Sequence, residues 1–287
     1  MSVIQTQELT YIYGENTPFK KTALDKVSIE INDGEIVGII GHTGSGKSTL
    51  IQHFNGLLKP SSGKVIVDGE DFIEDKEKLR IVRFKVGLVF QYPEYQLFEE
   101  TVYKDIGYGP KNMGLDEGEI DRRIHSAAKL VGLDEALLEK SPFELSGGQK
   151  RRAAIAGVMA MEPKVLILDE PASGLDPQGR DRIFEMIKSY HEQKKNAVLV
   201  VSHSMEDIAK IADRILVMNE GKVFYFDTPP KVFSRSEELE QIGLSTPQVT
   251  RIFRKLNEMG YNLPQDVYTV KYAEKVLKER LLEKGKV

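Results

Sequence analysis

The chain has 287 residues, of which 40% are hydrophobic and 29% are charged, and these values are ordinary for a globular protein. Its formal net charge of −4 gives no reason to expect nucleic-acid binding, and the absence of cysteine excludes disulfides, thiolate metal sites and a cysteine nucleophile. No apolar stretch reaches the roughly 20 residues that span a bilayer, and the first residues lack a signal-peptide pattern, so we expect the chain neither to span nor to cross a membrane.

The first expected elements are β-strands followed by a helix. Residues 3–12 and 26–31 are rich in β-branched side chains and predict two strands, with a turn at Asp33-Gly34 after the second. Residues 36–40 form a short, continuous apolar run, which is typical of a strand buried on both faces. The next expected elements are a helix over residues 48–58 and strands over 64–68 and 86–90.

A glycine-rich loop connects the apolar strand to this helix. It reads Gly41-His42-Thr43-Gly44-Ser45-Gly46-Lys47-Ser48 and matches G-x-x-x-x-G-K-[ST] in the strand–helix context that a phosphate-binding loop requires. In such a loop backbone N–H groups hold the α- and β-phosphates, Lys47 reaches the β- and γ-phosphate oxygens, and the Ser48 hydroxyl binds Mg²⁺. We therefore predict that residues 41–49, Thr49 included, bind ATP or GTP together with Mg²⁺. Tyr13 is expected to stack on the base, although Tyr11 could do so equally well and either could pack in the core.

The segment after the strand over 86–90 changes character. Gln91 follows that strand and could contact the metal ion or the attacking water, although alone it would be an ordinary polar loop residue. From Tyr92 onward apolar residues recur at helical spacing, so residues 92–163 are predicted to form a mostly helical insertion. Four of the eleven tyrosines lie between Tyr92 and Tyr108. Such enrichment is expected both of a surface that docks a partner and of a core beneath the insertion.

A second anion-binding element is predicted inside this insertion, at Leu145-Ser146-Gly147-Gly148-Gln149. Ser146 is a favourable helix N-cap, and the alanine-rich run over 151–161 favours a helix. The two glycines allow backbone N–H groups to approach an anion closely at the helix N-terminus, where the helix dipole favours negative charge. The chain thus carries two phosphate-binding elements, and they need not bind the same phosphate.

Buried strands return after the insertion, at residues 165–168, 197–201 and 214–218. Strands that alternate with helices predict an α/β core with a parallel sheet. Asp169 and Glu170 end the first of these strands, where Asp169 would hold Mg²⁺ and Glu170 would deprotonate the attacking water. The alternative is a salt-bridged strand end. His203 follows the second strand and could contact the γ-phosphate, whereas a lone histidine is more often structural.

The C-terminal residues predict further helices. Thr246 is expected to cap an amphipathic helix that has Pro247 in its first turn and ends at Gly260, and the apolar spacing over 270–281 predicts another helix. These helices could pack against the core, or they could form a subunit interface.

The order of these motifs resembles the nucleotide-binding subunit of an ABC transporter, and the resemblance also includes Ser173-Gly174-Leu175-Asp176. It implies a P-loop ABC ATPase core over residues 1–230 with N-terminal antiparallel strands and a helical subdomain over about 92–163, followed by a C-terminal helical extension over 231–287. It further implies a head-to-tail dimer that encloses two ATP molecules. The residues that would contact the ATP held by the other subunit are Ser146, Gly147, Gly148, Gln149 and Asp176.

A closer resemblance is to the ATPases of energy-coupling factor importers, which take up vitamins or transition-metal ions. It rests on Gly41-His42-Thr43, on residues 54–63, on 91–98 and on Tyr108-Gly-Pro-Lys-Asn112, and residues 91–96 resemble the second of the two paralogous ATPases. The resemblance implies a peripheral position on the cytoplasmic face of the membrane. It also implies a membrane scaffold subunit that docks near residues 91–108 and a separate membrane subunit that binds the substrate.

Other functions fit the sequence less well. ABC proteins that act on nucleic acid or ribosomes typically carry two cassettes or a long coiled-coil insertion, exporters are often fused to membrane spans, and many sugar importers append a β-rich domain. A non-hydrolysing module is disfavoured because Gln91, Glu170 and His203 are all present. Whether the dimer contains two copies of this chain or a paralogue stays open.

Overall fold

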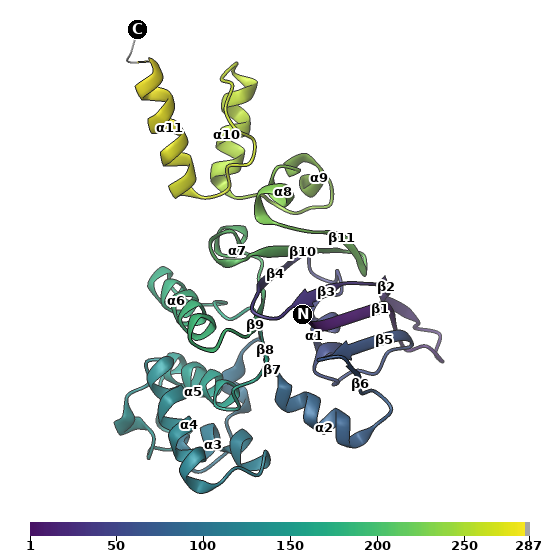
Figure 1. The fold of residues 1–287 in the computed structure, drawn as a ribbon, viewed down its shortest axis with the longest axis vertical. Helices are drawn as coiled ribbons and strands as arrows, with labels where there is room; N and C mark the ends of the chain where they lie inside the picture. The colour runs from purple at the N-terminus through teal and green to yellow at the C-terminus, as the bar shows by residue number, and fades with distance from the viewer. Residues whose placement is uncertain (285–287) are drawn as a thin grey trace.

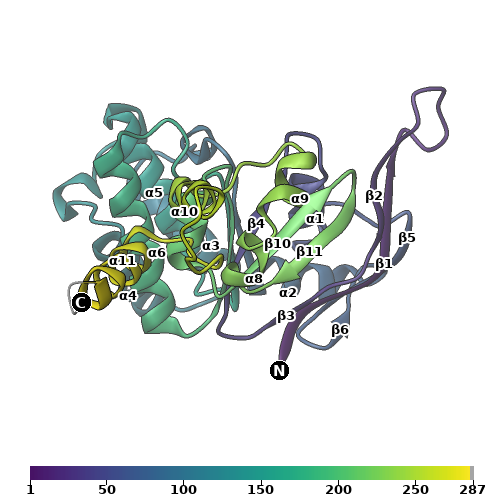
Figure 2. The ribbon, with the colours of Figure 1, turned by 90° about the horizontal axis from the view of Figure 1, so that it is seen from above.

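The computed structural model describes residues 1–284 and contains two β-sheets. The first is an antiparallel sheet in the order β2-β1-β5-β6, with β3 paired to β1 beside it. It stands on the opposite side of the molecule from the helical subdomain (Figures 1 and 2). Its strands are β1 (Ser2–Tyr13), β2 (Lys21–Val27), β3 (Glu30–Asn32), β5 (Ser62–Val67) and β6 (Glu70–Asp71).

The second sheet is central and has six strands in the order β11-β10-β4-β9-β8-β7. All neighbouring pairs are parallel except β10 with β11. Every residue of four of these strands is buried, which explains their continuous apolar sequences. The strands are β4 (Ile36–Ile40), β7 (Val86–Val89), β8 (Val165–Asp169), β9 (Ala197–Val201), β10 (Arg214–Asn219) and β11 (Lys222–Asp227).

The central sheet separates two hydrophobic cores, and β4 shows how. Val37 and Ile39 belong to the core shared with the antiparallel sheet, whereas Ile36 and Ile40 belong to the core shared with the helical subdomain. Successive side chains of a strand point to opposite faces, so each core takes alternate residues. Helix α1 (Lys47–Phe54) contacts β2, β5 and β7 on the first face. Helices α6 (Pro177–Lys194) and α7 (Met205–Ile211) contribute to the second core.

The insertion over 92–163 is mostly helical, as predicted. Helix α5 packs against α3, α4 and η1. The elements are η1 (Pro93–Gln96), α3 (Val102–Asn112), α4 (Glu117–Leu130), η2 (Glu135–Leu137), η3 (Pro142–Glu144) and α5 (Gly147–Met159).

The C-terminal region is helical and lies at the end of the molecule opposite the helical subdomain (Figure 1). Helices α10 and α11 lie side by side in both views and share a small core of Phe253, Val267, Ala273 and Val276 (Figures 1 and 2). The helices are α8 (Pro229–Phe233), α9 (Ser236–Gln241), α10 (Gln248–Glu258) and α11 (Val270–Lys284). Among the described residues no helix is both long and apolar enough to cross a membrane.

Three local expectations were wrong. Residues 26–31 do not form one strand, because β2 ends at Val27 and β3 begins at Glu30. The helix expected over 48–58 ends at Phe54, since Gly56 has φ +68° and cannot continue it. Thr246 does not cap α10, because the capping position falls on Pro247 and the buried Thr246 hydroxyl has no hydrogen-bond partner.

Several elements were not anticipated, among them α2 and β11. Helix α2 (Lys76–Lys85) is capped by Asp75, whose carboxylate accepts hydrogen bonds from the N–H groups of Glu77 and Lys78. Strand β11 was missed although residues 223–226 form a short apolar run, and these residues are only partly buried at the antiparallel edge of the sheet.

Candidate active site

The carboxyl ends of four parallel strands converge at one edge of the central sheet. The glycine-rich loop follows β4, Asp169 and Glu170 end β8, His203 follows β9, and Gln91 follows β7. A cleft of about 460 Å³ opens there. Of the residues predicted from the sequence, those that line it are Tyr13, Thr43, Gly44, Gly46, Lys47, Ser48, Thr49, Gln91, Asp169, Glu170 and His203.

Eight predicted residues do not line this cleft. Gly41, His42 and Ser45 belong to the loop but are not among the lining residues, and the other five lie at the N-termini of α5 and α6, namely Ser146, Gly147, Gly148, Gln149 and Asp176. Three lining residues were missed by the sequence analysis: Lys21, Ala23 and Val201. Lys21 and Ala23 enter from the antiparallel sheet, so only tertiary pairing brings them to the loop, and no motif marks them.

The glycine-rich loop is shaped to present backbone N–H groups. Gly46 has φ +103°, and a Cβ atom there would lie 2.6 Å from the carbonyl oxygen of Ala23, so only glycine fits. Gly46 also occupies the N-cap of α1 without a side chain to accept a hydrogen bond. The first N–H groups of α1 therefore lack a capping acceptor, and an anion can take that place.

Lys47 is buried and held by the loop itself. Its Nζ donates to the carbonyl oxygens of Gly41 at 2.7 Å and of His42 at 3.0 Å. Burial lowers the pKa of Lys47, and the nearby Glu170 and Asp169 carboxylates oppose that shift. The ammonium is thus fixed beside the loop, where it can reach the oxygens of a bound phosphate.

The Ser48 hydroxyl donates to Asp169 Oδ2 at 3.3 Å, which brings together two ligand types that suit Mg²⁺. Burial raises the pKa of Asp169, and the Ser48 hydrogen bond and Lys47 partly offset this. No group of three His, Asp or Glu side chains that could hold a metal occurs among the described residues. A nucleotide-bound Mg²⁺ needs no such group, because phosphate oxygens and water complete its shell.

Glu170 lies at the entrance of an unusual turn. Its φ is +51°, and the N–H of Ser173 donates to the Glu170 carbonyl oxygen at 3.1 Å. Burial raises the pKa of the Glu170 carboxyl to about 7, and Oε1 has no hydrogen-bond partner, although His203 Nε2 lies 3.4 Å away. Burial and Lys47 lower the pKa of His203. A carboxyl with a pKa near neutrality is well suited to act as a general base.

The two tyrosines near the loop differ in their surroundings. The Tyr13 hydroxyl lies 3.2 Å from Thr49 Oγ1, and its ring lines the cleft. Tyr11 contacts the rings of Tyr13 and His53 edge-on, each at a centroid distance of 4.8 Å, and does not line the cleft. The geometry favours Tyr13 as the side chain that a base could reach.

The helix N-terminus predicted at Ser146 forms as expected. Ser146 caps α5: its Oγ accepts from the N–H of Gln149 at 3.4 Å, and Gln149 Oε1 accepts from the N–H of Ser146 at 2.9 Å. Ser146, Gly147 and Gly148 are exposed, and open space surrounds the Cβ position of Gly147. Asp176 is also exposed and caps α6 through the N–H of Gly179 at 2.7 Å. Another molecule can approach this helix N-terminus closely.

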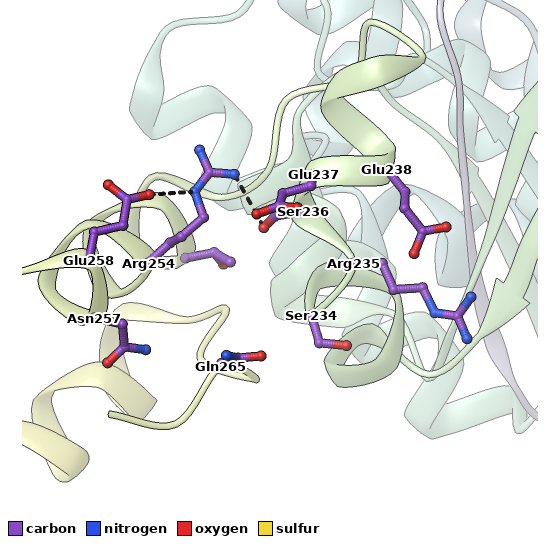
Figure 3. Close-up of a pocket in the computed structure, with 10 residues that line it drawn as sticks. Ser234, Arg235, Ser236, Glu237, Glu238, Arg254, Asn257, Glu258 and Gln265 are labelled. Carbon is purple, nitrogen blue, oxygen red and sulfur yellow. Dashed lines mark hydrogen bonds and ion pairs between the residues drawn. The ribbon is translucent and has the colours of Figure 1, made fainter. Parts of the chain in front are cut away.

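A larger cavity of about 510 Å³ lies between α8, α9 and α10 (Figure 3), but the two arginine side chains that line it already have partners. Arg254 pairs with Glu240 at 3.0 Å and with Glu258 at 3.9 Å, and Arg235 lies over the ring of Tyr225 at 4.4 Å. Its cations already have partners, so the cleft at the sheet edge is the better candidate for catalysis.

Comparisons with known proteins agree with this geometry. The ABC transporter family matches residues 24–173, so the chain belongs to the ABC transporter ATP-binding proteins. The energy-coupling factor transporter ATP-binding protein EcfA2 of Clostridium tetani is 56% identical over 275 residues, which are 96% of each chain. The protein of the same name in Caldanaerobacter subterraneus is 55% identical and covers 94% of this chain and 95% of its own. Within the family, the chain is therefore an energy-coupling factor ATPase of the second paralogous kind.

Solved structures show the same fold. The cbiO1 protein of Clostridium perfringens, part of the ABC transporter complex cbiONQ, is 38% identical with a TM-score of 0.75, covering 89% of this chain and 99% of that one. A bacterial ABC transporter cassette solved as a dimer is 29% identical with a TM-score of 0.70, covering 78% and 98%. The expected fold, an α/β ABC ATPase, is confirmed, and the chain is an ATPase whose hydrolysis is coupled to transport.

Glu170→Gln tests the role of the buried carboxyl. The amide keeps the size of the side chain but cannot accept a proton, so we expect turnover to fall by about 10²–10⁴-fold while ATP binding persists and a closed dimer accumulates. Radiometric hydrolysis, nucleotide titration and light scattering measure the three quantities. Glu192→Gln, at an exposed position on α6, is the matched control. Hydrolysis at the normal rate in Glu170→Gln would show that this carboxyl is not the base.

The pH dependence of hydrolysis follows from the same carboxyl. Glu170 must be ionised to accept a proton, so kcat/KM, which reports the free enzyme, should rise with pH to a plateau with a midpoint near pH 7. The folded chain holds this proton more tightly than the unfolded chain, whose carboxyl titrates near 4.5. Stability from this group is therefore lost as the pH rises from 4.5 to about 7, and Glu170→Gln should raise Tm at pH 8 but not at pH 4.5. A flat profile between pH 5.5 and 8.5 (range about one and a half units either side of the midpoint) would contradict the assignment.

Proposed function

We propose that this chain hydrolyses ATP with Mg²⁺ in a head-to-tail pair with a second ATPase subunit and thereby drives an energy-coupling factor importer of a vitamin or a transition-metal ion. The observation that carries the proposal is the separation of the two anion-binding elements. The phosphate loop lines a cleft that Ser146–Gly148 do not reach, while these residues are exposed and open. An ATP molecule that contacts both elements must lie between two subunits.

Each residue of the cleft receives a role in this proposal. Residues 41–49 bind the phosphates, and Tyr13 stacks on adenine. Ser48, Gln91 and Asp169 hold Mg²⁺, which offsets the negative charge that develops on the phosphates. Glu170 takes the proton of the attacking water, and His203 contacts the γ-phosphate.

The second subunit completes the site. Its contacts to the ATP of this chain would come from the counterparts of a group of residues at the N-termini of α5 and α6, which here are Ser146, Gly147, Gly148, Gln149 and Asp176. A related cassette solved as a dimer supports such a pairing. The partner is either a second copy of this chain or its paralogue.

The C-terminal extension, residues 231–287, is proposed as a further contact between the two ATPases. Large apolar side chains are exposed on α10, at its C-cap and on α11, namely Ile252, Met259, Val270 and Leu277. Such side chains on two adjacent helices are suited to bury one another across a subunit interface.

The membrane partners are proposed to dock at the aromatic surface formed by Tyr92, Tyr95, Phe98 and Tyr108. All four side chains are exposed, which favours a docking surface over a core beneath the insertion. Phe98 and Tyr108 meet edge-to-face at 5.0 Å and line an apolar cleft of about 360 Å³. In this proposal a membrane scaffold subunit occupies the cleft, a separate membrane subunit binds the substrate, and the chain lies peripherally on the cytoplasmic face.

Replacing Phe98 and Tyr108, which line this cleft, tests the importer assignment. Aromatic anchors typically contribute about 2 kcal/mol or more to an interface, so Phe98→Ala combined with Tyr108→Ala should reduce recovery of the membrane scaffold by more than tenfold. The measurement is the amount of scaffold that co-purifies from solubilised membranes with the tagged chain. Phe19→Ala, at an exposed aromatic on the β1–β2 loop, is the control. Unchanged recovery with the double variant would place the scaffold elsewhere, and recovery of no membrane protein with the unmodified chain would refute the importer assignment.

A further inference from the structure

A buried arginine on α5 connects this helix to two other segments of the chain. Arg151 lies in the second turn of α5, and its side chain is only 8% exposed. Its Nε and Nη2 atoms each donate to the Glu94 carboxylate at 3.3 Å, to Oε2 and Oε1 respectively. Its Nη1 donates to the carbonyl oxygen of Ser173 at 2.6 Å. One planar guanidinium thus uses all three of its nitrogens on two other segments.

Both of these segments carry residues of the hydrolysis site. Glu94 lies in η1, three residues after Gln91, and is itself mostly buried. Ser173 closes the turn that begins at Glu170, because its N–H donates to the Glu170 carbonyl oxygen. Arg151 therefore contacts the main chain of that turn directly and the Gln91 segment through one ion pair.

Each of the two segments contains a residue with an unfavourable backbone conformation, which a fixed contact would help to hold in place. Glu170 has φ +51° and Tyr92, between Gln91 and Glu94, has φ +58°, and neither is a glycine. Non-glycine residues stay in this backbone region only where the surrounding structure holds them. A bidentate, buried arginine–carboxylate pair supplies directional contacts of that kind.

Resting on the proposed hydrolysis site, we propose that Arg151 is a positioning residue for hydrolysis: it fixes the Glu170 turn and the Gln91 segment relative to α5. A rotation of the helical subdomain then changes the position of Ser173, and with it the Glu170 backbone, without any contact between Arg151 and the nucleotide. Through Glu94, the same guanidinium also connects the aromatic surface proposed for docking to the general base.

The proposal predicts a specific kinetic pattern in the assembled ATPase. Arg151→Met should lower kcat at least tenfold and leave the KM for ATP within about twofold, because Arg151 does not line the nucleotide cleft. Arg151→Lys should recover part of this loss, since an ammonium can bind Glu94 or the Ser173 carbonyl but lacks the fork that reaches both. Arg122→Met, which removes an exposed arginine paired with Glu119 in the same subdomain, is the control and should leave kcat unchanged.

A double-mutant cycle separates positioning from general stabilisation. Glu94→Gln should lower kcat by less than Arg151→Met, and the double variant should be no slower than Arg151→Met alone, because Glu94 acts through Arg151. Should Arg151→Met not fold, Arg151→Lys and Glu94→Gln carry the same test.

The outcomes that overturn the proposal differ from those that refute the hydrolysis site. The positioning role would be refuted by a kcat within twofold of the unmodified chain in Arg151→Met, or by losses that multiply in the double variant. Twofold is about the scatter seen for additive sites. In both cases Glu170→Gln still reports independently on the site itself. If Glu170→Gln has no effect, the proposed function fails rather than the role of Arg151 alone.

Discussion

The parallel pairing of β4 with β9 and of β9 with β8 is the constraint on which the rest of the structure depends. Parallel strands end at the same edge of a sheet, so three segments far apart in the chain deliver the phosphate loop, the two carboxylates and His203 to one place. The strands are buried on both faces, which fixes their register through packing. The packing of the core, rather than the conformation of the loops, therefore determines the geometry of the site.

The burial of one cationic and two acidic side chains then shifts the pKa values of the groups at that edge. Desolvation lowers the pKa of Lys47 and raises those of Asp169 and Glu170, and each carboxylate partly offsets the shift of the lysine. Two adjacent carboxylates are unfavourable in such a place unless a cation lies near them. In the proposed function, a nucleotide with Mg²⁺ would meet this requirement at Asp169 and would leave Glu170, with its pKa of about 7, free to accept a proton.

Sequence patterns predicted best those features that neighbouring residues determine. The apolar run of β4 and the helix N-cap at Ser146 were predicted because continuous burial and a helix N-terminus each leave a local signature. Sequence patterns did not predict the features that depend on tertiary contacts. Lys21 reaches the cleft only because β2 pairs with β1, and Arg151 meets Glu94 across 57 positions of the chain. No local pattern records either contact, and Thr246 misled because its hydroxyl is buried instead of capping a helix.

The central claim is that one ATP site needs two subunits, and Ser146→Arg tests it most directly. The arginine would obstruct the exposed N-terminus of α5, which lies outside the cleft of its own chain. The account predicts that this chain keeps its nucleotide affinity, measured by equilibrium titration, within about twofold, while hydrolysis at the P-loop of the partner falls by about tenfold or more. Equal loss of nucleotide binding in the altered chain itself would contradict the account, because it would place Ser146 at the site of its own P-loop.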